Sequence, residues 1–371
     1  MQDSSKYRPG AMLHLRGNAL AKGDPVALPV TQSSMYHLPG DPDGGPGYGR
    51  VSNATWEHLE HVLGNLEQAP ALAFPSGMAA ISASLFATVK AGSRVLIPSD
   101  GYYVTRRLCE RFLQNLGVVV DQRPTLEFAA GGLEEYDVVF AETPSNPGLD
   151  LCPLAEIADA VHAGGGLLIV DNTTMTPLGQ RPLELGADVV VASDTKAPGG
   201  HSDALMGHLA TRNAKVLETA REWRIFAGGI PGPQEAWLLH RGLETLEVRF
   251  DRMCSSAEVL AERLSGHSAL TALRYPGLPQ DPSHALAKAQ MERFGFLIGL
   301  TLDSKERAEA FINGCPLLRP ATSFGGVHSS AERRARWGDG VVPGFVRLSV
   351  GIEPVEELWA ALSAALDAAA G

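Results

Sequence analysis

Runs of apolar residues alternate along the chain with longer amphipathic stretches. The runs are short and rich in β-branched residues, which is typical of buried strands, and the longer stretches have helical spacing. Over residues 56–225 this alternation favours a mostly parallel sheet with helices on both faces. A strand at 204–211 is expected to run antiparallel at the sheet edge. The other expected strands are 71–74, 94–98, 137–142, 166–171 and 189–192, and the expected helices are 56–67, 79–90 and 154–163.

A different pattern begins near residue 246. A helix at 234–246 leads into a long apolar helix at 248–264, and a final helix spans 354–370. Longer helical stretches separate the strands here, as in a small α+β domain. These strands are expected near 272–277, 296–302 and 345–350. We therefore expect one domain at 56–246 and a C-terminal domain at 247–371.

Residues 1–47 are irregular and rich in glycine and proline. The pair Pro9-Gly10 and the run from Pro39 to Gly47 are incompatible with a helix or a central strand. Such a segment has to lie on another surface. We expect residues 1–55 to form an extended N-terminal arm that contacts a neighbouring subunit.

Composition limits the possible functions. The 371 residues include 44% hydrophobic ones, enough for at least two cores, and 31 basic against 42 acidic residues give a net charge of −11. This charge argues against nucleic acid or an anionic membrane as the main partner. No apolar run reaches ~18 residues and the N-terminus lacks the apolar core of a signal peptide, so we expect a cytoplasmic protein. The cysteines lie far apart without a paired motif, which predicts neither a metal site nor disulfides (Cys109, Cys152, Cys254 and Cys315).

The strand at 189–192 ends in Ser193-Asp194-Thr195-Lys196, and Pro198 and two glycines follow. A lysine delivered at the exit of an apolar strand must lose its charge, pair it, or become covalently bound. The last outcome describes a Schiff base with pyridoxal phosphate (PLP), whose phosphate Ser193 and Thr195 are suited to bind. A lysine after a strand is also commonly a solvated surface residue. The neighbouring residues in the sequence therefore have to show which of the two roles Lys196 has.

Asp171 ends the preceding expected strand. An acid at this place is suited to keep the pyridine nitrogen of PLP protonated, which makes the ring an electron sink. A strand-end aspartate is also an ordinary helix cap or turn residue. The two strand ends, about 25 residues apart, fit one βαβ crossover.

Five further segments match one family. They are Tyr48-Gly49-Arg50, Ser76-Gly77-Met78, Thr143-Pro144-Ser145-Asn146-Pro147, Arg241-Gly242-Leu243-Glu244-Thr245-Leu246 and Ser323-Phe324-Gly325-Gly326. With Asp171 and Lys196 they resemble the Cys/Met-metabolism family of PLP-dependent enzymes, which includes cystathionine γ-lyase, γ-synthase and β-lyase and methionine γ-lyase. The matching segments run from about Tyr48 to Glu353. The resemblance implies PLP fold type I, with a mostly parallel, seven-stranded type of sheet.

The resemblance also implies cofactor contacts. Tyr102 would stack on the cofactor ring and take part in catalysis together with Lys196. Gly77 and Met78 would bind the phosphate at a helix N-terminus, where free N–H groups favour an anion, although a plain helix start looks the same. Tyr48 and Arg50 would reach the phosphate of a neighbouring subunit, and the alternative is two exposed loop residues.

Three residues are implied in substrate binding. Asn146 and Ser323 would lie near the substrate, and Arg347 would bind its α-carboxylate, although a structural ion pair is the ordinary explanation for a charge in a strand. The chain also departs from the family. It has Asn53-Ala54-Thr55 where members usually have Asn-Pro-Thr, and Tyr103 and Val104 replace two glycines. At the position before Ser323, γ-lyases and γ-synthases often carry Glu and methionine γ-lyases Val, whereas this chain has Thr322.

These features together predict a carbon–sulfur lyase of the cystathionine γ-lyase type. It would convert L-cystathionine or a related sulfur amino acid into cysteine, 2-oxobutyrate and ammonia. The alternatives are cystathionine γ-synthase or another γ-replacement on an acylated homoserine, cystathionine β-lyase, and a PLP-binding protein without activity. Because Tyr48 and Arg50 would serve a neighbour, a homodimer is the expected minimal unit, paired into a homotetramer.

Overall fold

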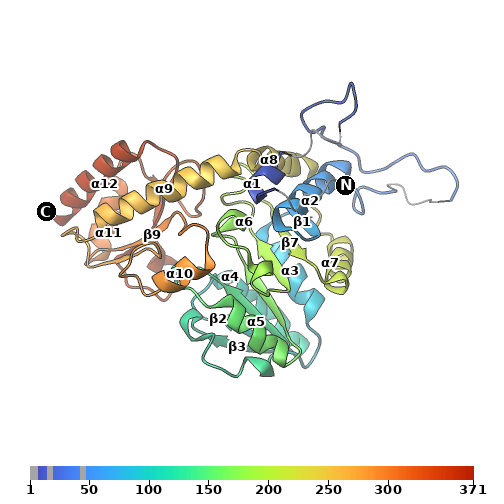
Figure 1. The fold of residues 1–371 in the computed structure, drawn as a ribbon, viewed down its shortest axis with the longest axis horizontal. Coiled ribbons are helices and arrows are strands. Elements are labelled where there is room, and N and C mark those ends of the chain that lie inside the picture. Colours follow the sequence, from blue (N-terminus) through green and yellow to red (C-terminus); the bar gives the residue numbers. More distant parts are fainter. Residues whose placement is uncertain (1–6, 15–19, 42–46) are drawn as a thin grey trace.

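The computed structural model describes residues 7–14, 20–41 and 47–371 (Figure 1). Its larger sheet has seven strands in the order β1-β7-β6-β5-β4-β2-β3. All neighbours from β3 to β6 are parallel, and β7 is antiparallel to β6 and to β1. The strands are β1 (Ala71–Phe74), β2 (Arg94–Pro98), β3 (Val119–Arg123), β4 (Val138–Glu142), β5 (Leu167–Asp171), β6 (Val189–Ala192) and β7 (Gly207–Thr211).

Two expectations about this sheet need correction. The expected strand at 204–211 is antiparallel, but β7 does not lie at the edge, because β1 pairs with its outer side from Ala71 to Phe74. The edge strand β3 was not predicted, since its residues are half-exposed or exposed and lack a continuous apolar run. The mostly parallel sheet itself is confirmed.

Helices cover both faces of this sheet. Along β4, Val139 and Ala141 belong to one apolar core while Val138 and Phe140 belong to another, because successive strand residues point to opposite faces. The first core also includes residues of α2 (Ala54–Glu67), α5 (Leu154–Ala163) and α8 (Pro233–Leu243). The second includes residues of α3 (Gly77–Thr88) and α7 (Ala214–Ala227).

A second sheet lies toward the C-terminal end of the chain, in the order β10-β11-β12-β9-β8 (Figure 1). The long helix α9 (Leu246–Leu264) extends from beside α8 to this sheet, whose core includes residues of α9, α11 (Lys305–Gly314) and α12 (Val355–Ala370). The short strands β10 and β11 were not predicted. The strands are β8 (Ala272–Arg274), β9 (Leu297–Thr301), β10 (Arg319–Pro320), β11 (Ser330–Arg333) and β12 (Phe345–Ser349). Smaller helices are α4 (Tyr103–Leu108), α6 (Thr176–Gly179) and α10 (His284–Gln290).

The described part of the N-terminal arm rests on its own chain. It contains the one-turn helix α1 (Pro9–Met12), so the expectation that no helix forms there is wrong: proline is tolerated in a first helical turn, where its missing N–H has no partner anyway. Further along, the Trp237 indole donates a hydrogen bond to the Leu28 carbonyl at 2.9 Å. Residues 1–6, 15–19 and 42–46 of the expected arm lie outside the described residues. Contact of the arm with a neighbouring subunit stays a prediction.

Candidate active site

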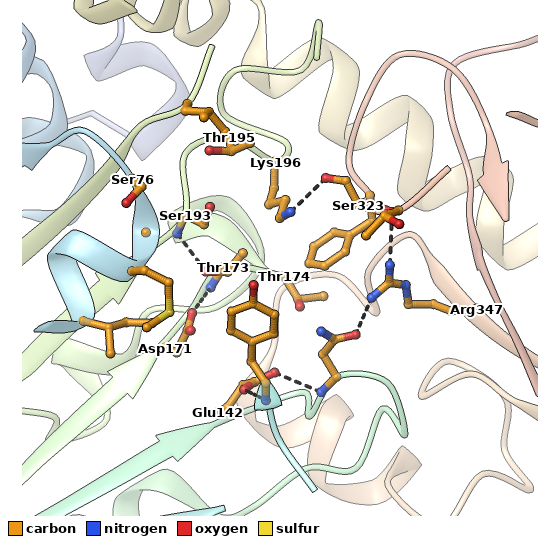
Figure 2. Close-up of a pocket in the computed structure, with 18 of the residues that line it drawn as sticks. Ser76, Glu142, Asp171, Thr173, Thr174, Ser193, Thr195, Lys196, Ser323 and Arg347 are labelled. Carbon is orange, nitrogen blue, oxygen red and sulfur yellow. Dashed lines mark hydrogen bonds between the residues drawn. The ribbon is translucent and has the colours of Figure 1, made fainter. Parts of the chain in front are cut away.

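Three neighbouring parallel strands end at one cavity (Figure 2). β4 ends at Glu142, β5 ends at Asp171, and the turn after β6 carries Lys196; all three residues line the cavity. Glu142 and Asp171 are partners in the sheet register. Ligands of open parallel sheets bind beyond the carboxyl ends of the strands, so this cavity is the candidate site.

Lys196 points into the middle of the cavity (Figure 2). Its Nζ donates a hydrogen bond to Oγ of Ser323 at 2.8 Å and lies 5.0 Å from the centre of the Phe324 ring. Burial lowers the pKa of this amine to about 8; the Arg347 guanidinium acts in the same direction and Asp171 opposes it. More of the amine is therefore neutral near neutral pH than for an exposed lysine, as a nucleophile or base requires.

Asp171 is both a turn residue and a wall of the cavity. Its Oδ1 accepts a hydrogen bond from the backbone N–H of Thr173 at 3.0 Å. Burial raises the pKa of this carboxyl, and the hydrogen bonds from Thr173 oppose the rise. Oγ1 of Thr173 accepts a hydrogen bond from the backbone N–H of Ser193 at 2.8 Å, which fixes the ends of β5 and β6 to each other.

The N-terminus of α3 forms the end of the cavity away from Arg347 (Figure 2). The backbone N–H groups of Gly77 and Met78 have no acceptor among the described residues. A Cβ at Gly77 would lie 2.5 Å from Cβ of Ser193, so glycine is required for this close approach. With Ser193 and Thr195 beside it, this end has the donors of an anion site.

Tyr102 and Glu142 both line the cavity. Glu142 accepts hydrogen bonds from the backbone N–H of Tyr102 at 2.6 Å and from that of Asn146 at 3.0 Å, and burial raises its pKa well above the usual range. Burial also raises the pKa of Tyr102, so its hydroxyl stays protonated. The Tyr103 ring packs edge-on against Tyr102 at 5.5 Å, and neither Tyr103 nor Val104 lines the cavity. The bulk that replaces the two family glycines therefore does not narrow it.

Arg347 reaches the cavity from β12 of the second sheet (Figure 2). Its Nη1 donates to Oδ1 of Asn146 and its Nη2 to the Ser323 carbonyl at 3.1 Å. Its buried Nε has no partner among the described residues. Burial lowers the pKa of Arg347 to about 10, which leaves the group charged at neutral pH. An unused N–H on a fixed guanidinium fits a carboxylate ligand.

Arg347 belongs to a network of charges that we call the arginine cluster; its members are Glu332, Arg334, Arg336, Asp339 and Arg347. All of them are buried except Arg336, whose side chain is 40% exposed. Glu332 lies opposite Arg347 in the antiparallel pairing of β11 and β12. It accepts hydrogen bonds from Arg347 at 3.2 Å, Arg334 at 2.7 Å and Arg336 at 2.8 Å. Burial acts to raise the pKa of Glu332, but Arg336, the Trp337 indole and Arg334 lower it to about 2. Glu332 is therefore a fixed carboxylate.

The sequence reasoning missed this cluster, although Arg334 lines the cavity. The available signal was the run Glu332-Arg333-Arg334-Ala335-Arg336, in which one acid is surrounded by arginines. Thr322, the position that separates the family subgroups, donates a hydrogen bond from its hydroxyl to Glu332 at 2.8 Å. A carboxylate therefore lies beside position 322, where γ-lyases and γ-synthases often carry Glu. In this chain the carboxylate is that of Glu332 in β11.

A second buried set of charges lies behind the Lys196 turn, and we call it the histidine cluster; its members are Glu67, Asp194 and His208. Nδ1 of His208 is 2.9 Å from Asp194 and Nε2 is 3.1 Å from Glu67. Burial acts to lower the pKa of His208, but the two carboxylates raise it to about 10. His208 is therefore a buried imidazolium, and none of the three residues lines the cavity. The sequence reasoning did not connect them.

Arg249 of α9 holds the chain that follows Lys196. It donates hydrogen bonds to the carbonyls of Ala197 at 2.6 Å, Pro198 at 3.1 Å and Gly242 at 2.6 Å. Gly200 packs so closely against this guanidinium, at φ +75°, that a Cβ would lie 2.0 Å from Nη1. The long helix between the two sheets is thus bonded to the lysine turn.

Tyr48 and Arg50 do not line the cavity that holds Lys196. They lie together in a separate surface pocket beside residues 230–233, with the Arg50 guanidinium 5.5 Å from the centre of the Tyr48 ring. Arg50 donates a hydrogen bond to the Ile225 carbonyl at 3.1 Å. Within one chain, the structure therefore separates these two residues from the other expected site residues.

The comparisons with known proteins agree with this arrangement. The family model described as Cys/Met metabolism PLP-dependent enzyme matches residues 11–367. The chain belongs to this family. Its cofactor is therefore PLP, and its PLP fold type I is shared with the family's solved structures.

Relatives and solved structures carry the names of several reactions. A Streptomyces coelicolor protein with the provisional name cystathionine gamma-lyase is 49% identical over 93% of this chain and 90% of its own length. The cystathionine beta-lyase of Lactococcus lactis subsp. cremoris is 34% identical over 92% of this chain and 94% of its own. The structure of cystathionine gamma synthase from Xanthomonas oryzae pv. oryzae in complex with cystathionine has a TM-score of 0.93 at 30% identity and covers 98% of each chain. The chain is thus an enzyme of the PLP-dependent lyase family, whose members' names differ in the reaction.

The cavity has the functional groups that PLP requires. It offers a primary amine in Lys196, a buried carboxylate in Asp171, and unpaired N–H groups at Gly77 and Met78. These groups match an aldehyde, a pyridine nitrogen and a phosphate. The residues present therefore fit the cofactor of the family.

The described residues contain no group of three or more His, Cys, Asp or Glu side chains that could hold a metal ion. The four cysteines are buried and free, and burial raises the pKa of Cys109 and Cys152 to about 12, so these thiols are not reactive thiolates at neutral pH. Within the part of the chain described, no helix is long and apolar enough to cross a membrane.

Proposed function

We propose that this enzyme is a carbon–sulfur lyase that acts on L-cystathionine by γ-elimination. One molecule of L-cystathionine and one of water give cysteine, 2-oxobutyrate and ammonia, and the bond that breaks is that between Cγ and sulfur. The relative that is 49% identical and provisionally named cystathionine gamma-lyase supports this reaction over its alternatives.

The observation that carries the proposal is the position of the Lys196 amine. It lies in the cavity between the Asp171 and Arg347 ends, and among the described residues it is hydrogen-bonded to the Ser323 hydroxyl and not to a carboxylate. An amine that is not held by a carboxylate is free to accept and deliver protons. γ-Elimination needs such a base, because protons leave both Cα and Cβ before the γ-substituent departs.

The other residues divide between cofactor and substrate. Asp171 would pair with the pyridine nitrogen of PLP, and Gly77, Met78, Ser193 and Thr195 would bind its phosphate. Bound PLP supplies a ring that accepts the electron pair left at Cα. Each of these contacts follows from the type of group that faces the cavity.

The substrate end has its own set of groups. Arg347, aided by Asn146, would bind the α-carboxylate, which places Cα beside the amine of Lys196. Lys196 would take the Cα proton and then move a Cβ proton, with the Ser323 hydroxyl as its partner in the resting site. The Tyr102 hydroxyl, kept protonated by burial, would donate a proton to the leaving sulfur.

Product analysis with L-cystathionine and added PLP tests the reaction. Mostly 2-oxobutyrate and cysteine are expected, whereas mostly pyruvate and homocysteine would make the enzyme a β-lyase. The control is Lys196→Ala, which should lose the visible absorbance of bound PLP and all turnover. A PLP-loaded wild type without turnover would favour γ-replacement on an acylated homoserine, as the γ-synthase likeness suggests, or a binding protein without activity.

We also propose that the active unit is a homodimer, paired into a homotetramer. Among the described residues, the arginines that line the cavity are Arg334 and Arg347, and both bond Glu332. They belong to the substrate end, so the phosphate end has no guanidinium from the described part of its own chain. Tyr48 and Arg50 stand apart from their own cavity and are free to serve that of a neighbour. Arginine is suited to this role because its fork donates two hydrogen bonds to one phosphate.

Mixing two inactive variants tests this sharing. Lys196→Ala lacks the amine, and Arg50→Ala lacks the proposed phosphate contact, so each homodimer should be weak or inactive. A refolded mixture should recover activity, because one site of each hybrid dimer has both groups intact. Arg8→Ala refolded with Lys196→Ala is the matched control for a mutation elsewhere in the arm. If the Arg50→Ala mixture gains nothing while wild type sediments as an active monomer, the sharing is refuted.

A further inference from the structure

The cavity contains a guanidinium that neither PLP nor an α-carboxylate requires. We propose that Arg334 binds a second carboxylate of the substrate, at the far end of the group attached to sulfur. The inference deepens the proposed function and rests on it for the sulfur amino acid. It identifies the substrate class as amino acids whose γ-substituent ends in a carboxylate, rather than simple S-alkyl amino acids.

Arg334 is placed rigidly. It is 3% exposed and begins the short 3₁₀ helix Arg334–Trp337 directly after β11. Its Nη1 donates to Glu332 at 2.7 Å and its Nε donates to Asp339 at 2.8 Å, while Nη2 lies 2.7 Å from the same oxygen of Asp339 as an ion pair. These carboxylates hold the guanidinium in one orientation, so little conformational entropy remains to be lost when a ligand binds.

Arg334 keeps donors for a ligand. A guanidinium has five N–H donors, and the contacts with Glu332 and Asp339 account for one on each of its three nitrogens. One N–H on Nη1 and one on Nη2 therefore remain, and Arg334 lines the cavity. Two N–H groups on neighbouring nitrogens match the two oxygens of a carboxylate.

The wall around Arg334 is polar where an apolar tail would need apolar contacts. The Thr322 hydroxyl is bonded to Glu332 at 2.8 Å, and Arg334 stands next to that carboxylate. The opposite interpretation is that Arg334 only holds Glu332 and so keeps Arg347 in place. This positioning role would affect every substrate equally, because every substrate has the α-carboxylate.

The test compares two substrates that differ only at the far end. L-Cystathionine has a terminal amino acid group on sulfur, whereas S-ethyl-L-homocysteine has none, and both give 2-oxobutyrate. The variant is Arg334→Gln combined with Asp339→Asn, which removes both charges of one ion pair and so avoids a lone buried carboxylate. Arg336→Met is the matched control, since Arg336 also bonds Glu332 at 2.8 Å but does not line the cavity.

We expect the double variant to lose about 10- to 100-fold in kcat/KM for L-cystathionine, mostly through KM, and less than about threefold for S-ethyl-L-homocysteine. The control should lose less than about threefold for both substrates. Equal losses for both substrates in the double variant would overturn the inference and leave Arg334 a positioning residue. Thermal unfolding and PLP absorbance of each variant show that the comparison is made on folded, loaded enzyme.

Failure of the proposed function gives a different result. If wild type forms no 2-oxobutyrate from either substrate, γ-elimination is wrong, and the same variants are assayed for γ-replacement by cysteine. The pair is then O-succinyl-L-homoserine, which has a terminal carboxylate, and O-acetyl-L-homoserine, which does not. A selective loss for the succinyl compound supports the inference; wild type without preference for it overturns the inference.

Discussion

Two charge clusters, buried apart from the Arg336 side chain, flank Lys196, and they are built in opposite ways. The histidine cluster sets two carboxylates against one imidazole behind the strand, and each member bonds another member. The arginine cluster sets two buried guanidinium groups and the exposed Arg336 against two carboxylates, and the two buried arginines also line the cavity. The first cluster is closed on itself, while the second keeps N–H donors for a ligand.

The difference distinguishes charged side chains that stabilise the fold from charged side chains that bind a ligand. A buried ion pair gains little over apolar packing, but loss of one partner is costly because it leaves a charge unpaired. In the histidine cluster every change therefore affects folding. In the arginine cluster Glu332 has several donors, so one donor can be lost at lower cost to folding and at higher cost to binding.

The largest expected effect is on folding. His208→Leu leaves Asp194 and Glu67 buried without their partner, and we expect the free energy of unfolding to fall by about 3–5 kcal/mol in chemical denaturation. His162→Leu is the control, because His162 pairs with Asp188 at the surface and its loss should cost less than about 1 kcal/mol. If the two changes lowered the free energy of unfolding equally, burial would not make the ion pairs of the histidine cluster more important for stability than the surface pair of His162.

The same cluster predicts a pH dependence. The folded-state pKa of His208 is raised to about 10, above the ordinary value of 6.5. Its stabilising contribution is thus fully present below about pH 6.5 and is lost as pH rises toward about 10. Denaturation midpoints of wild type should decline over this range more steeply than those of His208→Leu. Parallel curves would contradict a buried imidazolium.

The next effect is on catalysis. Arg347→Met removes the proposed α-carboxylate contact, and kcat/KM should fall by on the order of 100-fold, which corresponds to about 2.7 kcal/mol. Glu332 keeps Arg334 and Arg336 as partners, so unfolding should change less than in His208→Leu. Arg347→Lys keeps the charge without the fork and should recover only part of the activity. A folded Arg347→Met enzyme with normal kinetics would mean that the arginine cluster does not bind the substrate.

The smallest effect is at Thr322. Thr322→Val removes one hydroxyl donor from Glu332, which also has the bonds of Arg334, Arg336 and Trp337. We expect a loss of about 1 kcal/mol or less in kcat/KM, with Thr322→Ser close to wild type because it keeps the hydroxyl. A larger loss than in Arg347→Met would mean that Thr322 itself touches the substrate.

The large sheet could be predicted well from the sequence. The strands at 71–74 and 94–98 and the helix at 154–163 have the predicted bounds, because buried parallel strands are continuous apolar runs and their helices are amphipathic. The mistakes lie where the apolar pattern is weak. The edge strand β3 is half-exposed or exposed, and β11, which lies between β10 and β12, reads Ser-Ala-Glu-Arg and has neither an apolar run nor alternation. The pairing of β1 with the outer side of β7 could not be predicted, because the pattern of residues along one strand does not show which strand it pairs with.

The candidate site divides in the same way. Asp171 and Lys196 could be placed from strand ends, since parallel strands bring such residues to one edge. Glu332 and Arg334 could not. Glu332 faces Arg347 across the register of β11 and β12, and Arg334, in the 3₁₀ helix after β11, is held by Glu332 and Asp339. The histidine cluster likewise joins residues from α2, the Lys196 turn and β7. Charges that are buried by one another have no signature in local hydrophobicity.

The Arg249 contacts link the motion of the two halves of the molecule. The amides of Gly199 and Gly200, bonded to the carbonyls of Asp194 and Lys196 at 2.8 Å, lie in the turn whose carbonyls Arg249 holds from α9. For these amides to exchange with deuterium, the turn has to open, and α9 resists that opening. Slow exchange of the Gly199 and Gly200 amides would therefore report how firmly α9, and with it the second sheet, is held against the Lys196 turn. From the two glycines alone, a flexible loop would be expected at this place.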